Sequence, residues 1–506
     1  MSAPAPLPAA PPARLGADAL AVAGDRLSVP KYDRAALRGG IVHIGVGGFH
    51  RAHLAAYLHD LLQAGATDWS IIGSGVLATD AAMADVLRAQ DGLYVLIERE
   101  GIEAVGSIVG SITDYVHAGD DSSALVAHLV DPATKIVSMT ITESGYPVEH
   151  GQFVETDALR GDAPATAATA TARDDPPRTT FGIVVTALDA RRRAGLGPFT
   201  VLSCDNLPGN GDVARVATLG AASLWSSELS SWLEANGAFP NAMVDRITPA
   251  TTDADRALVR DRYGLIDEWP VSCEPFRQWA LEDEFCAGRP PFERAGVLVT
   301  HDVGPYEQMK LRLLNGSHSG LAYHAALAGI VLVHDAMAEP VIERFVRRLM
   351  AVEVAPNLDQ PPGIDLGAYQ GELVHRFANA AIGDQVARLC MDGSAKFPTF
   401  IVPSLEAQLA VGGPVRMLAL VLAGWCRYLR GRADDGSALT LAHDPFLPEA
   451  VQAANESVAD PTRFLSYHRA LGTTLHQSDR LVTEFTEALA SLERIGSLAT
   501  LDLWTR

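Results

Sequence analysis

The chain has 506 residues, 48% of them hydrophobic and 20% charged, and carries a formal net charge of −21. These values indicate a globular protein too long for one compact core, so we expect two large domains or three smaller ones. The acidic charge, with no basic run longer than Arg191-Arg192-Arg193, argues against a nucleic-acid partner and weakly favours an uncharged substrate.

The N-terminal segment, residues 1–12, is rich in Ala and Pro, and we interpret it as a tail rather than a signal peptide. The most apolar later run, residues 326–333, is too short to cross a bilayer, so we expect no membrane segment. The five cysteines are widely separated without a CxxC pair, which predicts neither a disulfide framework nor a structural zinc cluster. We therefore expect a cytoplasmic protein.

Short apolar and β-branched runs predict four strands, in residues 41–44, 69–73, 136–142 and 199–204. After the first strand, residues 51–64 have the apolar spacing of a helix. Strands that alternate with helices predict an α/β fold with a parallel sheet, which binds ligands at the carboxyl ends of its strands.

Residues 156–180 consist largely of Ala, Thr, Asp and Pro and predict a surface loop or a mobile insertion. From about residue 301 onward helical periodicity dominates. The predicted helical segments are residues 307–327, 341–351, 414–430 and 479–492. The expected organisation is an N-terminal tail (1–30), an α/β domain (31–300) and a mostly α-helical domain (301–506).

The first predicted strand leads into Gly45-Val46-Gly47-Gly48 and then into a helix. Glycines at such a turn let the backbone approach a dinucleotide pyrophosphate. His50 stands where the usual fingerprint has its third glycine, so the motif alone fits a plain strand-to-helix turn equally well. His50 and His53 could form a metal pair, but no third ligand stands at a familiar spacing, and we expect no metal.

A second informative stretch contains Lys310, Asn315 and His318. At 100° per residue these side chains fall at about 0°, 140° and 80° on one helix, an arc that a long lysine can share. A lysine with a lowered pKa can accept a hydroxyl proton while amide N–H groups hold the developing oxyanion. The stretch therefore predicts metal-free alcohol oxidation, or alternatively a solvated lysine followed by a capping asparagine.

Two further clusters are open to two readings. Asn206 follows the fourth predicted strand and either faces a ligand at the sheet edge or belongs to an Asx-type turn. Arg388 and Lys396 place two cations around a turn, which suits sugar hydroxyls or carboxylates and is equally ordinary on a surface.

Taken together, these segments resemble the polyol-specific long-chain dehydrogenase/reductase family over about residues 30 to 500. The resemblance is carried by five motifs: Ile44-Gly45-Val46-Gly47-Gly48-Phe49-His50-Arg51-Ala52-His53, Thr140-Ile141-Thr142-Glu143-Ser144-Gly145-Tyr146, Ser203-Cys204-Asp205-Asn206-Leu207, Met243-Val244-Asp245-Arg246-Ile247-Thr248-Pro249 and Lys310-Leu311-Arg312-Leu313-Leu314-Asn315-Gly316-Ser317-His318. It implies an extended Rossmann-type domain followed by a mostly helical C-terminal domain, both of which contribute to the active site.

The resemblance also implies a role for each candidate residue. Lys310 is the general acid/base, Asn206 and Asn315 polarise the reacting oxygen, His318 orients the substrate, and Glu307 gates proton movement to solvent. The residues implied in substrate binding are Arg388, Lys396 and Asp245. The residues predicted to bind the cofactor are Gly45, Gly47, Gly48, Phe49, His50, Arg51, Asp80 and Glu143.

Within this family the segment from Asp392 to Pro398 looks most like the mannitol branch, so D-mannitol and D-fructose are the expected substrate pair, with fructuronate and D-arabinitol as alternatives. Asp80, the nearest acidic residue after the second strand, favours NAD over NADP, unless it is only a helix cap. A non-catalytic nucleotide sensor and a zinc alcohol dehydrogenase are the rival classes. Family members are often monomers, so we expect a monomer or a weak oligomer.

Overall fold

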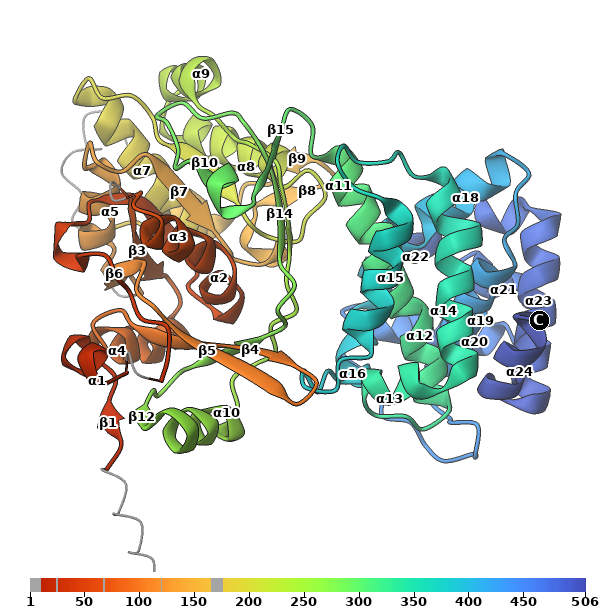
Figure 1. Ribbon diagram of the computed structural model, residues 1–506. Helices are drawn as coiled ribbons and strands as arrows, with labels where there is room; N and C mark the ends of the chain where they lie inside the picture. Colours follow the sequence, from red (N-terminus) through yellow and green to blue (C-terminus); the bar gives the residue numbers. More distant parts are fainter. Residues whose placement is uncertain (1–10, 24–25, 67–68, 120, 165–175) are drawn as a thin grey trace, which may run out of the picture. The chain divides into compact units, whose positions relative to one another are not determined.

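The computed structural model describes residues 11–23, 26–66, 69–119, 121–164 and 176–506 (Figure 1). The chain divides into two compact units, Met1–Val303 and Gly304–Arg506. The first contains the predicted α/β sheet, and the second is built from helices.

A five-stranded sheet forms the centre of the first unit, and all of its strand pairs are parallel. Its strands are β2 (Gly39–Ile44), β3 (Ser70–Gly75), β6 (Ile112–His117), β7 (Ile136–Met139) and β10 (Thr200–Ser203). The order β10-β7-β2-β3-β6 is that of a Rossmann fold: the first strand lies in the middle, later strands are added on one side and then on the other, and the switch of sides falls between β2 and β7. The four strands predicted from sequence are confirmed, although β7 ends at Met139 rather than at residue 142.

Helices cover both faces of this sheet because its strands are apolar on both sides (Figure 1). Ile41 packs in a core with Leu58, whereas its neighbour Val42 packs in a second core with Val184, since successive side chains of a strand point to opposite faces. The covering helices are α3 (Leu54–Gln63) and α4 (Ala81–Ala89) in the first core and α5 (Ser123–Val130), α7 (Thr180–Arg193) and α8 (Asn210–Trp225) in the second.

The helix predicted for residues 51–64 is interrupted. Helix α2 (Gly48–Ala52) starts at the glycine turn, His53 leaves helical geometry with φ −117° and ψ −92°, and α3 follows. The His53 ring nitrogen Nε2 lies 2.9 Å from the carbonyl oxygen of Gln278. The ring at the break thus contacts a residue far away in the chain, a contact that apolar spacing alone could not predict.

Two three-stranded sheets and several short elements complete the first unit. The small sheets are β13-β4-β5, with β4 (Tyr94–Glu100), β5 (Glu103–Val109) and β13 (Val271–Cys273), and β11-β14-β15, with β11 (Ala242–Asp245), β14 (Gln278–Glu282) and β15 (Leu298–Thr300). The other elements are η2 (Arg34–Ala36), η3 (Ala78–Asp80), η4 (Glu143–Gly145), β8 (Val148–Glu149), β9 (Gln152–Phe153), α6 (Asp157–Asp162), α9 (Ser227–Asn236), α10 (Asp253–Leu258), η6 (Val259–Tyr263) and η7 (Phe292–Ala295).

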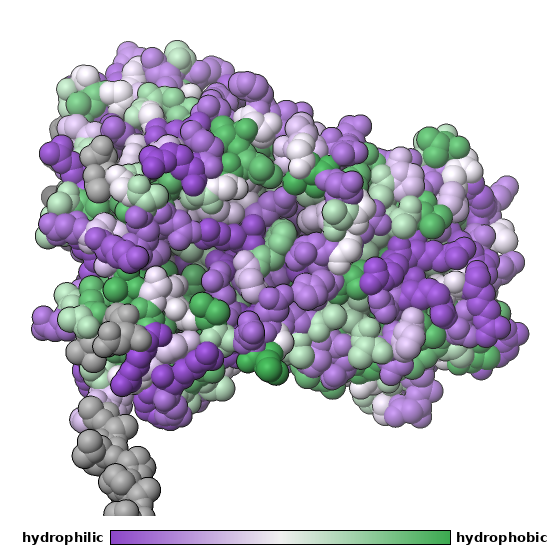
Figure 2. All heavy atoms as spheres, viewed as in Figure 1, coloured by the Kyte–Doolittle hydropathy of each residue, from purple (hydrophilic) through white to green (hydrophobic). Residues whose placement is uncertain are grey.

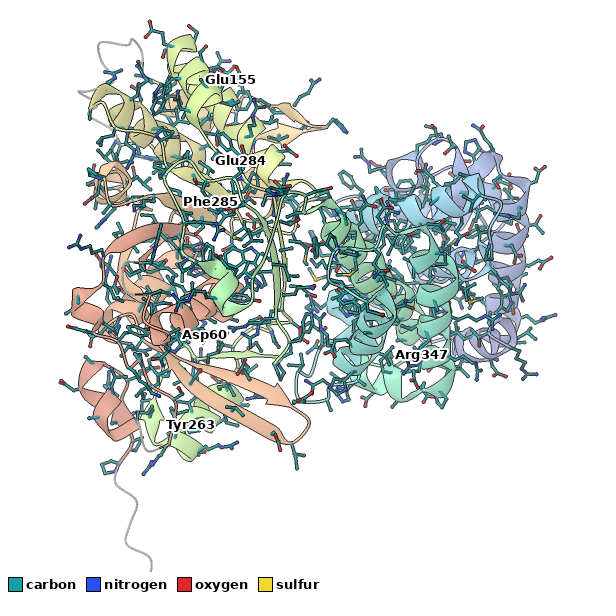
Figure 3. The ribbon with its side chains drawn as sticks, turned by 45° about the horizontal axis from the view of Figure 1, so that its top comes forward. Asp60, Glu155, Tyr263, Glu284, Phe285 and Arg347 are labelled. Atoms are coloured by element: carbon teal, nitrogen blue, oxygen red, sulfur yellow. The ribbon has the colours of Figure 1, made fainter. Side chains whose placement is uncertain are left out.

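Part of the segment predicted as an N-terminal tail is folded. β1 (Ala13–Arg14) pairs in parallel with β12 (Leu265–Ile266), and η1 (Ala17–Ala19) and α1 (Leu20–Ala23) follow. Leu15 is 2% exposed in a small core that also contains Tyr263, a residue labelled in Figure 3. Residues 1–10, and residues 165–175 of the predicted insertion, lie outside the described residues.

The second unit is helical. Its elements are α11 (Gly304–Met309), η8 (Lys310–Asn315), α12 (Gly316–Leu327), α13 (Val333–Ala338), α14 (Pro340–Arg348), η9 (Leu349–Val354), η10 (Ala355–Asn357), α15 (Leu366–Phe377), α16 (Val386–Leu389), α17 (Gly393–Phe400), α18 (Val402–Ala410), α19 (Arg416–Leu429), α20 (Leu447–Glu456), α21 (Thr462–Leu465), α22 (His468–Leu471), η11 (Leu475–Gln477), α23 (Asp479–Ile495) and α24 (Ser497–Trp504). The four predicted helical segments are confirmed, but η8 and η9 are π-helical, so uniform α geometry was the wrong expectation there.

Helix α19 is largely buried and packs against α12 and α23. Its N-terminus is satisfied by Glu353, whose carboxylate accepts hydrogen bonds from the backbone N–H groups of Met417 and Leu418 at 2.7 and 2.9 Å. None of the helices described combines the length and the apolar character that a membrane span requires. The face shown in Figure 2 is mostly hydrophilic, in keeping with the acidic composition.

Candidate active site

The glycine turn lies at the carboxyl end of β2, beside the point where the sheet reverses its strand order. Gly45 has φ 94°, and a Cβ there would lie 2.2 Å from the carbonyl oxygen of Thr140, so only glycine fits. At Gly47 the nearest heavy atom to such a Cβ would be 4.0 Å away. The turn therefore presents bare backbone, as a site for a dinucleotide pyrophosphate requires.

The residues after the turn face the protein interior. His50 and Arg51 are each 1% exposed, and the His50 ring stacks on that of His43 with centroids 3.5 Å apart. Burial lowers the pKa of His43 to about 3 and that of His50 well below its usual value, which keeps both rings neutral. The structure therefore places these two predicted cofactor-binding side chains behind the turn, while Phe49 is half-buried and stacks on His53.

Asp80 lies at the carboxyl end of β3. A Cβ on Gly75 would come within 2.7 Å of an Asp80 carboxylate oxygen and of the Tyr115 hydroxyl, so these two groups adjoin the end of the strand. The Asp80 carboxylate accepts a hydrogen bond from the Leu77 N–H at 3.0 Å. Asp80 thus acts as a cap for η3 and also holds the position after the second strand where a ribose-binding carboxylate is expected.

Polar groups gather at the ends of the neighbouring strands β7 and β10. Glu143 and Asn206 are both exposed there. The intervening Asp205 is 8% exposed, and its carboxylate accepts hydrogen bonds from the Tyr146 hydroxyl at 2.6 Å and the Thr142 N–H at 2.8 Å. Burial raises the pKa of Asp205, and these hydrogen bonds oppose that rise.

Asp205 and Tyr146 were not among the predicted site residues. Tyr146 belongs to the family motif that follows β7, and Asp205 to the motif that follows β10. These two strands are neighbours in a Rossmann sheet, so the sequence could have suggested that the two side chains meet.

Asp245, predicted to bind substrate, is the last residue of β11 and is 5% exposed. The nearby loop before β14 is tied to α3 by an ion pair between Arg277 and Asp60, the residue labelled on α3 in Figure 3. The Arg277 guanidinium also lies over the Tyr57 ring, 4.2 Å from its centroid. Asp245 therefore sits in a well-packed part of the first unit.

Lys310, Asn315 and His318 lie on one continuous helix formed by α11, η8 and α12. Lys310 is 8% and His318 9% exposed, while Asn315 and Glu307 are half-buried. Because a π-helix bonds residues i and i+5, it turns less per residue than an α-helix. The predicted arc of Lys310, Asn315 and His318 is therefore narrower than α geometry gives, and the π segment brings the three groups closer to one face.

The two predicted cations of the substrate site belong to neighbouring helices. Arg388 on α16 forms an ion pair with Asp384, with 2.5 Å between nitrogen and oxygen, and Lys396 on α17 donates to the carbonyl oxygen of Leu389 at 3.4 Å. Helix α16 packs against α12, which carries His318, and α17 packs against η8, which carries Lys310. The second unit thus brings the predicted acid/base and substrate groups together.

The residues fit a dinucleotide cofactor. The bare glycine turn suits phosphates, and among the described residues the buried Tyr115 hydroxyl and Ser74 hydroxyl have no hydrogen-bond partner, as expected of polar groups at a ligand edge. Across the described part of the chain, no group of three or more His, Cys, Asp or Glu side chains could hold a metal ion.

The fold and the turn define a Rossmann-type dinucleotide-binding protein with an appended helical unit. A family model described as the mannitol dehydrogenase Rossmann domain matches residues 39–294, and one described as the mannitol dehydrogenase C-terminal domain matches residues 302–493. The chain belongs to the mannitol dehydrogenase family, as the resemblance to polyol-specific long-chain dehydrogenases predicted.

Relatives match over nearly the whole chain. A mannitol 2-dehydrogenase of Pyrenophora tritici-repentis is 46% identical over 94% of this chain and 83% of its own length, and one of Aspergillus terreus is 44% identical over 96% and 97%. Among solved structures, the Pseudomonas fluorescens mannitol 2-dehydrogenase in ternary complex with NAD and D-mannitol matches with TM-score 0.85 and 42% identity over 97% of this chain and 99% of its own. A D-sorbitol dehydrogenase matches with TM-score 0.87 and 34% identity over 96% and 100%.

Proposed function

We propose that the protein oxidises D-mannitol to D-fructose with NAD as hydride acceptor and without a catalytic metal. The observation that carries this proposal is the 42% identity over 97% of the chain to a mannitol 2-dehydrogenase solved with NAD and D-mannitol. Several further relatives above 40% identity carry the same name. A nicotinamide dinucleotide bound at the glycine turn would supply the hydride-accepting ring.

The chain's own residues would manage the proton and the charge on oxygen. Lys310, in its uncharged form, would take the hydroxyl proton as the alcohol is oxidised, and Glu307, three residues earlier on the same helix, would pass it toward solvent. The side-chain N–H groups of Asn206 and Asn315 would donate hydrogen bonds to the reacting oxygen, where negative charge develops. His318, held against the Phe377 ring with centroids 4.2 Å apart, would fix the substrate's orientation.

The charges around Arg388 favour a neutral polyol over a sugar acid. Its guanidinium is paired with Asp384, which offsets its charge but leaves N–H donors for hydroxyl groups. Lys396 and Asp245 are the other proposed substrate ligands. With the chain's net charge of −21 adding no attraction for an anion, fructuronate is a poorer fit than D-mannitol.

NAD is the proposed cofactor because of the acidic group at the end of β3. The Asp80 carboxylate would accept hydrogen bonds from ribose hydroxyls and repel the 2′-phosphate of NADP. Phe49, Glu143 and the glycine turn would complete the cofactor site, supported from behind by His50 and Arg51.

The test is a substrate panel with the purified protein. We expect NADH to form from NAD with D-mannitol at a higher kcat/KM than with D-sorbitol or D-arabinitol, fructose to be reduced in preference to fructuronate, and NAD to be used in preference to NADP. Activity should persist after treatment with a chelator, because the proposed base is a lysine. D-Sorbitol is the second candidate, because a D-sorbitol dehydrogenase is among the structural matches; a higher kcat/KM for D-sorbitol would replace D-mannitol.

Further parts of the proposal concern organisation and setting. We propose a cofactor domain over residues 31–300 and a catalytic domain over residues 301–506, in a monomer or weak oligomer. The five cysteines are unpaired, as suits a cytoplasmic location.

A further inference from the structure

Asp205, at the end of β10, uses its carboxylate to hold the loop after the neighbouring strand β7. One oxygen accepts hydrogen bonds from the Tyr146 hydroxyl at 2.6 Å and the Ile141 N–H at 3.1 Å, and the other accepts from the Thr142 N–H at 2.8 Å. The Tyr146 hydroxyl also lies 2.7 Å from that of Ser203. A carboxylate with three donors and 8% exposure is fixed in one orientation.

The backbone of Asp205 is fixed as well. The Asn210 side-chain amide donates to the carbonyl oxygen of Asp205 at 3.0 Å and to that of Ala242 at 2.7 Å, and its own oxygen accepts from the Ala242 N–H at 2.9 Å. The peptide that leads into Asn206 is therefore tied to β11. Asn206 is exposed and directly follows Asp205, whose carboxylate and backbone carbonyl are both held by hydrogen bonds.

The loop that Asp205 holds is strained. Thr142 has φ 63° and ψ 167°, a conformation that a β-branched residue adopts only when its surroundings impose it. The same loop reaches the glycine turn, because the Thr140 hydroxyl donates to the carbonyl oxygen of Gly45 at 2.7 Å. One hydrogen-bonded set thus connects the ends of β2, β7 and β10.

A second buried aspartate of the first unit, Asp162, holds a loop by similar hydrogen bonds but is not part of the set that connects β2, β7 and β10. Asp162, 5% exposed, accepts hydrogen bonds from the N–H groups of Arg178 and Thr179 at 2.9 and 2.8 Å and from the Thr179 hydroxyl at 2.5 Å. These hydrogen bonds hold the loop before α7, and their partners Arg178 and Thr179 are not candidate site residues. A buried aspartate with this hydrogen bonding can therefore serve stability alone. Asp205 differs from Asp162 because it directly precedes Asn206 in the chain and holds Thr142.

We propose that Asp205, together with Tyr146, is a positioning residue that sets the Asn206 amide and the Thr142 loop in the geometry needed at the reacting oxygen. This inference rests on the proposed function. It predicts that loss of the clamp slows turnover while substrate and cofactor still bind, because a small displacement of an oxygen-polarising group is costly in the transition state.

The test compares Asp205→Asn with Asp162→Asn, which removes a matched carboxylate. We expect Asp205→Asn to lower kcat for D-mannitol by about 10-fold or more, with KM and the dissociation constant of NADH changed by less than about 3-fold. Asp162→Asn should lower the melting temperature but leave kcat near the wild-type value. Equal kcat values in the two variants would overturn the inference.

A double-mutant cycle separates positioning from a general loss of order. In an Asn206→Ala background, Asp205→Asn should lower kcat by a clearly smaller factor than in the wild type, because the amide that it positions is gone and only its hold on the Thr142 loop remains. An undiminished effect there contradicts the inference. If Asp205→Asn does not fold, Tyr146→Phe replaces it, with an expected kcat loss of about 3-fold or more and the same dependence on Asn206. If the wild-type protein forms no NADH with any polyol, the proposed function is wrong. If the wild type is active and the Asp205→Asn variant is equally active, only the positioning role of Asp205 is wrong.

Discussion

Arg51 holds the glycine turn from inside the protein. Its guanidinium donates to the carbonyl oxygen of Gly47 at 3.3 Å and also to that of Trp269, while the Arg51 carbonyl accepts from the Tyr94 hydroxyl at 2.6 Å. Because Arg51 is only 1% exposed, its side chain supports the turn from within the protein and does not face a bound ligand. The N–H groups of Gly45 and Val46 donate to the carbonyl oxygen of Ser74, so an anion would bind at the N–H groups that follow, where α2 begins.

Arg51→Met should therefore weaken cofactor binding as well as stability. We expect the dissociation constant of NADH to rise by about 10-fold, because the turn loses a charge-assisted hydrogen bond. The control is Arg191→Met, which removes a guanidinium that is 4% exposed and likewise donates to backbone carbonyls, those of Gly197, Leu129 and Asp131. Titration of NADH fluorescence measures both, and equal affinities in the two variants would contradict this role for Arg51.

The motifs predicted which residues matter but not how deeply they lie. His50 and Arg51 follow the glycine turn directly, so proximity in sequence suggested contact with the cofactor, whereas helix α2 turns both inward. The clamp of Asp205 on Thr142 depends on contacts between residues more than 60 positions apart. Sequence spacing carries no direct record of such contacts.

At the scale of elements, the π-helical segment η8 is the main departure from the sequence-based picture. The apolar spacing of residues 307–327 correctly predicted a continuous helix, and it could not reveal the extra residue in one turn. A π turn costs hydrogen-bond geometry and recurs at functional sites. Here it lies between Lys310 and Asn315, the two residues whose alignment the proposed chemistry needs most.

The strained turn after β7 can be tested by relieving it. Thr142→Gly should raise the free energy of unfolding by about 1 kcal/mol, because removing strain of roughly 1–3 kcal/mol outweighs the roughly 0.5–1 kcal/mol entropic cost of glycine. Thr142→Ala keeps a Cβ and should give no such gain. Urea unfolding of the three proteins measures the difference, and a glycine variant less stable than the alanine variant would show that the turn is not strained.

For the whole molecule, the order of strands and helices followed from local periodicity and from the five motifs. The Rossmann strand order could be expected because parallel strands need helical crossovers. What local patterns could not give were the small sheets around the main one and the pairing of β1 with β12, since both join segments far apart in the chain. The catalytic roles could be predicted only from the family motifs, because Lys310, Asn315 and His318 by themselves would fit a solvent-exposed helix equally well.

Buried histidines make the whole molecule sensitive to acid. Burial lowers the pKa of His43 and His53 to about 3 and that of His59 and His324 to about 4, from a usual 6.5. The unfolded chain therefore binds these protons as the pH falls below 6.5, while the folded protein does not until about pH 3 to 4. The free energy of unfolding is therefore at its full value above pH 6.5 and falls below it, by roughly 2 kcal/mol per histidine at pH 5.

The melting temperature should accordingly fall clearly between pH 7 and pH 5. His324 is hydrogen-bonded to the Ser497 hydroxyl at 2.9 Å and the Leu420 carbonyl at 3.2 Å, and His324→Gln should reduce the pH dependence of the helical unit's unfolding while lowering its stability at pH 7. Scanning calorimetry at several pH values measures this. A melting temperature that is constant between pH 7 and pH 5 would show that these histidines are not held neutral in the folded protein.

The central claim is that the buried amine of Lys310 moves the substrate proton, and the most direct measurement is the rate of NADH formation by Lys310→Ala with added primary amines. The variant should lose at least about 10²-fold in kcat, keep its affinity for NADH, and regain turnover in proportion to the concentration of free amine. Lys31→Ala, at an exposed lysine of the first unit, should behave as the wild type. A Lys310→Ala variant with wild-type turnover, or one that no amine restores, would contradict the account.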